Sequence, residues 1–266
     1  MLTKEQKQFY KDNGFIKLEN IFTKEEMDVL SDEYNELFTR KQTESDMEAS
    51  WKGNDMKEAA KETPVVVLSI HNLQFHSAIF SRVLQHEKIL DALEDIMETP
   101  NILLHHTKAH LKPPSKGAPY LMHQDYHYFP FKKHSMVAVF IHMDDTTPEN
   151  GGLCVYPGSH KLGPLYDKGS EDEKGEKYHY MKPEDFPIEK ATPIHAKRGD
   201  VVVFSYLLVH GSYLNTSERV RRMFLIQLMA AEDEPANNEH KSPGQGWVLR
   251  GRNLKRDASM SNRFAH

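Results

Sequence analysis

From residue 101 onward the chain consists of short runs rich in β-branched and aromatic residues, with no long helical pattern between them. The strands expected from these runs lie at 101–111, 121–129, 136–143, 152–155, 200–206 and 222–229. Turn signals such as 148–151 and 198–200 separate them. Many short strands without helical crossovers favour sheets packed on sheets over an α/β sheet. We therefore expect a mainly β protein with a jelly-roll core.

The first third of the sequence predicts helices that flank this core. Helices are expected at 4–13, from 23 to about 40, and at 87–97, with a brief strand at 15–18. Gly14 suits the left-handed conformation that ends many helices. Thr23 and Glu26 have the spacing of a capping box, which marks a helix start.

One domain is expected over 1–266. It would comprise a mostly helical flank (1–100), a jelly-roll core (101–232) and a C-terminal extension (233–266). The charged segments 41–61 and 166–190 are expected to be a surface loop and a surface insertion.

Composition excludes several classes of protein. With 38% hydrophobic and 27% charged residues, the sequence is typical of a globular protein rather than a disordered one. A net charge of -5 gives no support to nucleic-acid binding, and no apolar stretch approaches the roughly 20 residues that span a bilayer. The single cysteine, Cys154, excludes an intrachain disulfide and favours the cytoplasm. No feature of the sequence specifies an oligomeric state.

His123 and Asp125 are the first candidates for a metal site. Side chains at i and i+2 of an extended strand share a face, so a strand over 121–129 would present both to one ion. His210 ends an apolar run far downstream. Two histidines and one carboxylate leave open coordination positions, an arrangement typical of non-haem Fe(II) oxygenases. Because the chain has 16 histidines, the His-x-Asp spacing taken alone also fits chance.

A 2-oxo acid cosubstrate at such a centre would need a fixed cation for its distal carboxylate. Arginine suits this task because its planar guanidinium binds a carboxylate through two hydrogen bonds. Arg219, Arg221 and Arg222 stand at the start of the strand expected over 222–229. Alternation puts Arg221 and Arg222 on opposite faces, and the residues themselves do not decide between them.

Several stretches together resemble the phytanoyl-CoA dioxygenase family of Fe(II)/2-oxoglutarate oxygenases, whose fold is a cupin-like double-stranded β-helix. They lie at 100–102, 112–114, 122–131, 150–153, 157–161 and 210–212. The resemblance implies that His123, Asp125 and His210 bind the iron and that Arg221 binds 2-oxoglutarate. It also implies that Ser212 and Gln124 line the cosubstrate or the iron.

The sequence departs from the family pattern at two positions. Phe140 stands where the family has a tryptophan, which keeps an apolar wall at the cosubstrate site. A family lysine near the cosubstrate falls near Ser69 here, and Lys108 on the preceding strand is our candidate for a replacement cation. A solvent-facing strand lysine is the alternative for Lys108.

The resemblance implies an enzyme that uses Fe(II), 2-oxoglutarate and O2 to hydroxylate an unactivated C–H bond while 2-oxoglutarate becomes succinate. The expected substrate is a small molecule: an acyl-CoA, an acid or a natural-product intermediate. Asp125 occupies the position that halogenases leave open for a halide, so hydroxylation is favoured. Tyr126 and Tyr128 are expected to line the substrate pocket. The alternatives are a non-catalytic metal or 2-oxoglutarate sensor, a zinc hydrolase and a structural jelly-roll module.

Overall fold

The computed structural model describes residues 1–43, 48–50, 67–115, 117–171, 177–237, 242–253 and 255. Its α-helices are α1 (Lys4–Asn13), α2 (Lys24–Thr43), α4 (Ala78–Val83) and α5 (Glu87–Met97). Short 3₁₀ helices are η1 (Leu73–Phe75), η2 (Asp125–His127), η3 (Ser159–Leu162) and η4 (Ile188–Lys190). The first strands are β1 (Phe15–Leu18), β2 (Glu48–Ser50), β3 (Val67–His71), β4 (Ile102–Lys112), β5 (Tyr120–His123), β6 (Val137–His142) and β7 (Leu153–Val155). The later strands are β8 (Ser170–Glu171), β9 (Lys177–Tyr178), β10 (Thr192–Pro193), β11 (Val201–Ser205), β12 (His210–Ser212), β13 (Arg221–Ala230) and β14 (Val248–Arg250).

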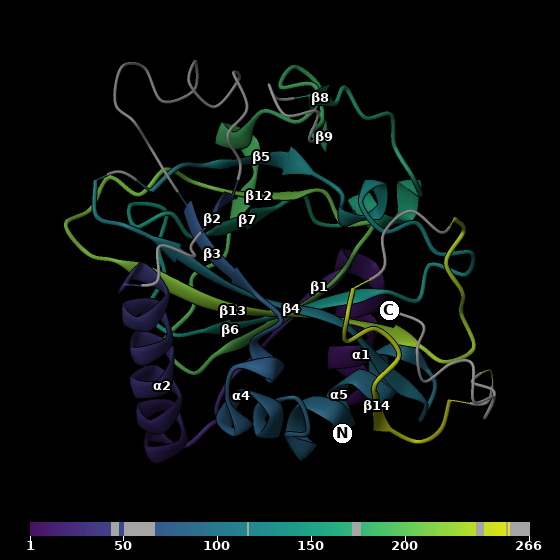
Figure 1. Cartoon of the computed structure of the whole chain (residues 1–266). Helices are drawn as coiled ribbons and strands as arrows, with labels where there is room; N and C mark the ends of the chain where they lie inside the picture. Colours follow the sequence, from purple (N-terminus) through teal and green to yellow (C-terminus); the bar gives the residue numbers. More distant parts are fainter. Residues whose placement is uncertain are drawn as a thin grey trace.

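Two antiparallel sheets form the centre of the molecule. The larger has the order β1-β11-β6-β13-β4-β3-β2, with β14 added on β4, and the smaller has the order β10-β7-β12-β5. Figure 1 shows β5, β12 and β7 in a layer above β13, β4 and β6. Sequence neighbours are often not sheet neighbours, so the chain passes repeatedly between the two layers. This confirms the predicted jelly-roll core.

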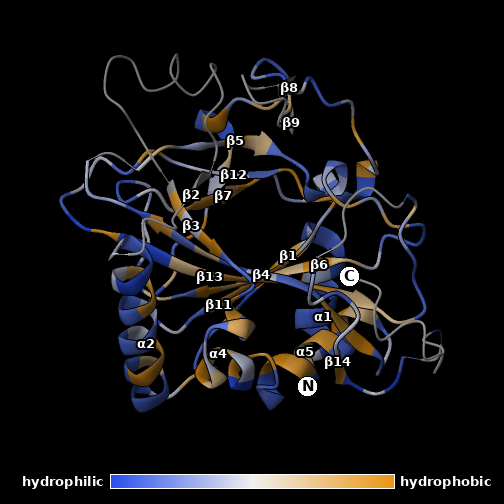
Figure 2. Ribbon diagram, viewed as in Figure 1, coloured by the Kyte–Doolittle hydropathy of each residue, from blue (hydrophilic) through white to orange (hydrophobic). Residues whose placement is uncertain are grey.

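The helices cover the outer face of the larger sheet (Figure 1). Phe224 and Ile226 of β13 point outward into a core that includes Leu30 of α2 and Leu93 of α5. Apolar colour gathers on the strands and on the sheet-facing side of α2, while the far side of α2 is hydrophilic (Figure 2). Among the described residues, no helix combines the length and apolar character needed to cross a bilayer.

Alternate residues on the same strands fill the space between the sheets. Phe140 of β6 and Leu225 of β13 point inward and meet Leu153 and Val155 of β7. Both faces of the central strands are therefore buried, which explains their nearly unbroken apolar sequences. The candidate functional side chains lie between the two sheets.

Helix ends follow local signals in the sequence. Gly14 has a φ of 78° and caps α1 as predicted. A Cβ at this position would lie 2.4 Å from Nδ1 of His160, so a side chain does not fit. Thr23 and Glu26 make the reciprocal hydrogen bonds of the predicted capping box at the start of α2.

The strand expected over 121–129 is shorter in the structure. It ends at His123, and Asp125 begins the 3₁₀ helix η2. The backbone N–H of Tyr126 donates to the carbonyl of Tyr206, which lies between β11 and β12, at 3.2 Å. The chain after His123 therefore leaves its pairing with β12. A long-range contact thus overrides the extended pattern of the sequence.

The charged segment 41–61 differs in part from the expected surface loop. Residues 41–43 continue α2, and residues 48–50 form β2, which pairs with β3. The remainder of this segment lies outside the described residues.

The segment 166–190 also departs from a plain surface insertion. Tyr180 and Met181 are buried. The N–H of Met181 donates to the carbonyl of Met122 at 2.7 Å, next to the end of β5. The described part of this segment is therefore packed against the smaller sheet.

Candidate metal centre

The three predicted iron ligands lie together between the sheets. His210 begins β12 and stands opposite His123, the last residue of β5, with ring centroids 4.2 Å apart. Oδ1 of Asp125 lies 3.6 Å from Nε2 of His123 and 3.7 Å from Nε2 of His210. Two ligand atoms that are each about 2.1 Å from one ion can lie up to about 4 Å apart. One ion can therefore contact all three side chains.

Strand alternation does not explain how His123 and Asp125 meet. The expectation that both lie on one strand was wrong, because Asp125 belongs to η2. The turn after β5 brings the carboxylate back beside the imidazole. The two residues therefore converge by a change of backbone direction rather than by a shared strand face.

Hydrogen bonds orient each ligand toward the others. Nδ1 of His123 bonds the Leu121 carbonyl at 2.7 Å, and Nδ1 of His210 bonds the Leu208 carbonyl at 2.9 Å. Since a carbonyl only accepts, each Nδ1 carries the proton and each Nε2 keeps a lone pair for a metal. Gln227 Nε2 donates to Oδ2 of Asp125 at 2.6 Å, which leaves Oδ1 for the ion.

The protonation states of Asp125 and His210 favour metal binding at neutral pH. Burial would raise the pKa of Asp125, but His210, His123 and Gln227 outweigh it and lower that pKa to about 2. Burial, and next the nearby His123, lowers the pKa of His210 to about 4. A carboxylate and neutral imidazoles are the forms that bind a metal. The donor set therefore fits Fe(II), with positions left open for other ligands.

Arg221 lies at the other end of the inward face. It begins β13 and is 2% exposed, and its Nε and Nη2 donate to the Gly151 carbonyl at 3.1 and 2.5 Å. Arg222 points the other way and forms an ion pair with Asp144 at 2.6 Å. The structure thus separates two arginines that the sequence left equivalent, and Arg221 faces the space between the sheets.

Lys112 stands opposite Arg221 across the β13–β4 pair. Its Nζ donates to Ser212 Oγ at 2.7 Å and to the Tyr213 carbonyl at 2.6 Å, and the side chain is fully buried. Burial, and next the charge of Arg221, lowers the pKa of Lys112 well below its usual value. Among the described residues, neither cation has a carboxylate within ion-pair distance. Arg221 and Lys112 are adjacent, buried and, within the described part of the chain, without an acidic partner, so an anion bound beside them would favour the charged form of Lys112.

Sequence reasoning missed Lys112 and selected Lys108. The two lysines lie on the same face of β4, four residues apart. Lys112 pairs with Arg221, whereas Lys108 pairs with Leu225. Alternation along β4, together with the pairing of its end with the start of β13, would have identified Lys112. Ser212 accepts a hydrogen bond from Lys112, and its role at the cosubstrate stays a prediction.

The model of the phytanoyl-CoA dioxygenase (PhyH) family matches residues 10–223. The chain belongs to this family. It is 30% identical to a probable alpha-ketoglutarate-dependent hypophosphite dioxygenase from Stutzerimonas stutzeri, over 87% of this chain and 80% of that protein. It is 29% identical to the peroxisomal phytanoyl-CoA dioxygenase of Rattus norvegicus, over 84% of this chain and 67% of that protein. The chain is accordingly an iron- and 2-oxoglutarate-dependent dioxygenase.

Solved structures share the fold of this family member. The 2-oxoglutarate-dependent carbocyclase SnoK from nogalamycin biosynthesis matches with a TM-score of 0.71 and 18% identity, over 92% of this chain and 93% of that one. EctD from S. alaskensis, solved with 2-oxoglutarate and 5-hydroxyectoine, matches with a TM-score of 0.66 and 20% identity, over 94% and 84%.

Two further residues predicted to lie near the cosubstrate or the iron, Gln124 and Phe140, are both buried. Gln124 is fully buried, and its side-chain N–H groups donate to the carbonyls of Gly163 and Leu207. Its side-chain oxygen accepts from the N–H of Leu165 at 2.9 Å. Gln124 therefore connects the two predicted iron ligands on either side of it to two loops. Phe140 lies on the inward face, edge-on to another ring.

The two predicted substrate tyrosines of the dioxygenase diverge. Tyr128 presents its ring edge-on to His123, with centroids 6.4 Å apart. Tyr126 instead packs against Tyr206 and His134, at 5.7 and 5.6 Å. Tyr128 thus adjoins the metal centre, whereas Tyr126 supports the loop behind it.

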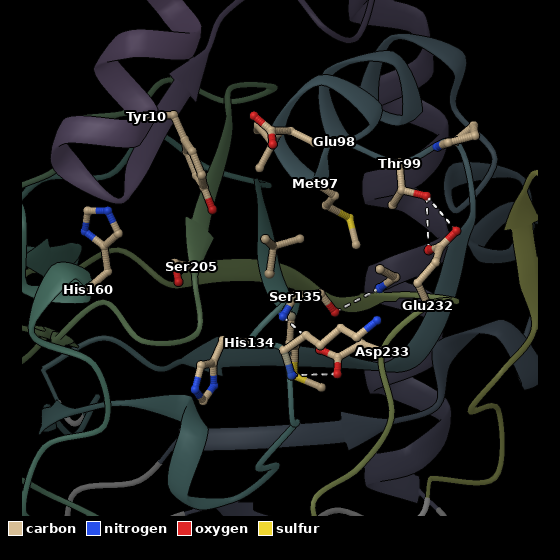
Figure 3. A pocket seen from close by; sticks show the side chains of 16 residues that line it. Tyr10, Met97, Glu98, Thr99, His134, Ser135, His160, Ser205, Glu232 and Asp233 are labelled. Atoms are coloured by element: carbon tan, nitrogen blue, oxygen red, sulfur yellow. Dashed lines mark hydrogen bonds between the residues drawn. The ribbon is translucent and has the colours of Figure 1, made fainter.

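An open pocket of about 660 Å³ lies elsewhere, where residues of α1, of 96–100 and of 133–137 meet (Figure 3). On its wall, Thr99 donates to Glu232 and the N–H of Ser135 donates to Asp233. The metal ligands and the two buried cations do not line this pocket. It is therefore distinct from the catalytic site.

Proposed function

We propose that this dioxygenase hydroxylates an unactivated C–H bond of a small organic substrate, with iron on His123, Asp125 and His210. Arg221 and Lys112 together hold the distal carboxylate of 2-oxoglutarate. The observation that carries this proposal is the pair of buried cations on the same inward face as the three metal ligands. An anion between the cations would compensate two charges that the described residues leave without an acidic partner.

Each side chain has a defined task in this reaction. The two imidazoles and the carboxylate hold the metal and leave one side of it open. When bound, iron and 2-oxoglutarate supply the reduction of O2 coupled to decarboxylation of the oxo acid to succinate. Arg221 and Lys112 fix the oxo acid in one orientation, and Phe140 and Leu225 keep that region apolar. Carboxylate ligation by Asp125 takes the place a halide would need, which supports hydroxylation.

The substrate belongs to the class of acyl-CoA thioesters, organic acids or natural-product intermediates. The names of the relatives support a small molecule, and Tyr128 is the predicted substrate contact that adjoins His123. The proposed compartment is the cytoplasm, supported by a single buried cysteine, whose thiol pKa is raised to about 12 by burial.

The assignment of the two cations is tested by binding of 2-oxoglutarate without oxygen. Arg221→Met and Lys112→Met should each weaken 2-oxoglutarate binding by about 10- to 100-fold, because a hydrogen bond to a charged group is worth about 1.5–3 kcal/mol. Lys108→Met is the matched control and should leave the affinity unchanged. A loss confined to Lys108→Met would show that Lys108, as the sequence suggested, binds the cosubstrate.

Catalysis separates an enzyme from a sensor. The wild-type protein with iron, 2-oxoglutarate and O2 should release succinate at a rate that substrate increases. Asp125→Ala should abolish that release. Binding of both ligands without any succinate would instead indicate a sensor.

A further inference from the structure

His127, Asp167 and His179 form a second group of two imidazoles and one carboxylate, which the proposed reaction does not use. One ligand atom from each residue lies within 4.8 Å of the others, as in the group of His123, Asp125 and His210. His127 ends η2, whereas Asp167 and His179 belong to the segment 166–190. We propose that this group binds a second divalent transition-metal ion, of the zinc class, beside the iron centre.

The carboxylate of this second group is held in place. Oδ1 of Asp167 accepts from the N–H of Tyr180 at 2.8 Å and from the N–H of Gly169 at 3.1 Å. Oδ2 contacts Nδ1 of His179. The side chains of Asp167 and His179 are only 13% and 19% exposed. One oxygen is thus fixed by the backbone, and the other is directed at the imidazole.

His127 supplies a buried nitrogen that is available to bind a metal. Its Nε2 is buried and has no hydrogen-bond partner among the described residues. The ring also makes a hydrogen bond with the backbone at Leu165. Metal-binding imidazoles commonly use one nitrogen for a backbone carbonyl and the other for the ion. The rings of His127 and His179 stack with centroids 5.6 Å apart, and one ligand atom of each lies within 4.8 Å of the other.

Two imidazole nitrogens and one carboxylate oxygen form a donor set that suits zinc or a similar ion, with water completing the shell. An alkaline-earth ion would prefer oxygen ligands throughout. The chemistry of the donor atoms therefore points to a borderline-soft divalent metal.

Such an ion would join two parts of the active-site wall. The hydroxyl of Tyr128 accepts from the N–H of His179 at 3.0 Å, and the Tyr128 ring faces the iron ligand His123. Figure 1 shows β8 and β9, which lie between Asp167 and His179 in the chain, above β5. A metal at the second group would fix the segment around 179 to η2 and hold Tyr128 against the iron centre.

The experiment measures Zn²⁺ bound per chain after chelator treatment, by equilibrium dialysis and metal analysis. The wild-type protein should bind two equivalents. Asp125→Ala removes the iron centre and should bind one. Asp125→Ala combined with His179→Ala should lose the remaining equivalent, with at least a 100-fold weaker affinity. His195→Ala removes an exposed histidine elsewhere and, combined with Asp125→Ala, should keep it.

The separate variants distinguish failure of this inference from failure of the iron centre. Binding by Asp125→Ala that His179→Ala abolishes supports the second site. No binding by folded Asp125→Ala, or binding that survives His179→Ala, would show that the second group is only a hydrogen-bonded cluster. Circular dichroism verifies folding, and His210→Ala in place of Asp125→Ala provides an independent way to remove the iron centre.

Discussion

At the scale of single residues, the metal centre depends on hydrogen bonds that set the direction of each ligand. The imidazoles of His123 and His210, the proposed iron ligands, each bond a carbonyl two residues earlier in the chain, so both present Nε2. The carboxylate is oriented differently, by Gln227 on the facing strand β13. The larger sheet therefore supplies the contact that directs a ligand held by the smaller one.

Replacing Gln227 should weaken the centre without removing a ligand. Gln227→Leu leaves Asp125 free to turn, and we expect the affinity for Fe(II) to fall by about 10- to 100-fold. Anaerobic metal titration measures it. Ser69→Ala is the control, because the buried hydroxyl of Ser69 has no hydrogen-bond partner among the described residues. An unchanged affinity in Gln227→Leu would show that the ligand is oriented by other contacts.

Individual site residues were predictable where a local motif carried them. The resemblance predicted the group of His123, Asp125 and His210 that the structure brings together, whereas the strand face expected for His123 and Asp125 was wrong. Lys112 required knowledge of which strand pairs with β13, and alternation within one strand does not supply it. The group around His127 was not found because its other members lie in a charged segment that suggested only surface.

At the scale of elements, a buried tyrosine of α2 helps to fix this helix to the larger sheet. The hydroxyl of Tyr34 lies 2.7 Å from the carbonyl of His110 on β4 and 3.1 Å from that of Met223 on β13. These two residues are directly paired across the strands. Tyr34 therefore links the helix to the strands that carry Lys112 and Arg221.

Removing this hydroxyl should destabilise the protein. Tyr34→Phe should lower the free energy of unfolding by about 1–2 kcal/mol, because it removes a buried hydrogen bond between α2 and the sheet. Urea unfolding measures the change. Tyr166→Phe is the matched control at a side chain that is 75% exposed, and it should have no effect. Equal stability of the two variants would contradict the proposed anchor.

Element boundaries were predictable where caps or turns define them. Gly14 and the Thr23–Glu26 pair fixed helix ends from the sequence. The end of β5 was not predictable, because the extended pattern continues past His123, whereas the chain enters η2 and bonds the carbonyl of Tyr206.

At the scale of the whole molecule, two sheets and a helical layer enclose several buried histidines. The single domain over 1–266 stays a prediction. Burial, and next the charges of Arg221 and Lys17, lowers the pKa of His142 to about 3. Burial also lowers the pKa of His106 and His110 well below the usual value. These imidazoles stay neutral in the folded state.

The protein should therefore lose stability in mild acid. Below about pH 6.5 the unfolded chain binds protons that the folded protein does not, so stability falls as pH decreases from there toward the folded pKa values. Each such histidine contributes up to about 1.4 kcal/mol per pH unit. His142→Asn should reduce this dependence between pH 6.5 and 4.5, measured by urea unfolding. A variant with the same pH dependence as the wild type would contradict the assignment.

The most direct test of the account is anaerobic titration with Fe(II) and 2-oxoglutarate, followed through the weak visible charge-transfer band of the chelated complex. The wild-type protein should develop this band at one iron and one 2-oxoglutarate per chain, and His210→Ala should not. A band of equal strength in His210→Ala, or none in metal-loaded wild-type protein, would contradict convergence of the three side chains on one iron.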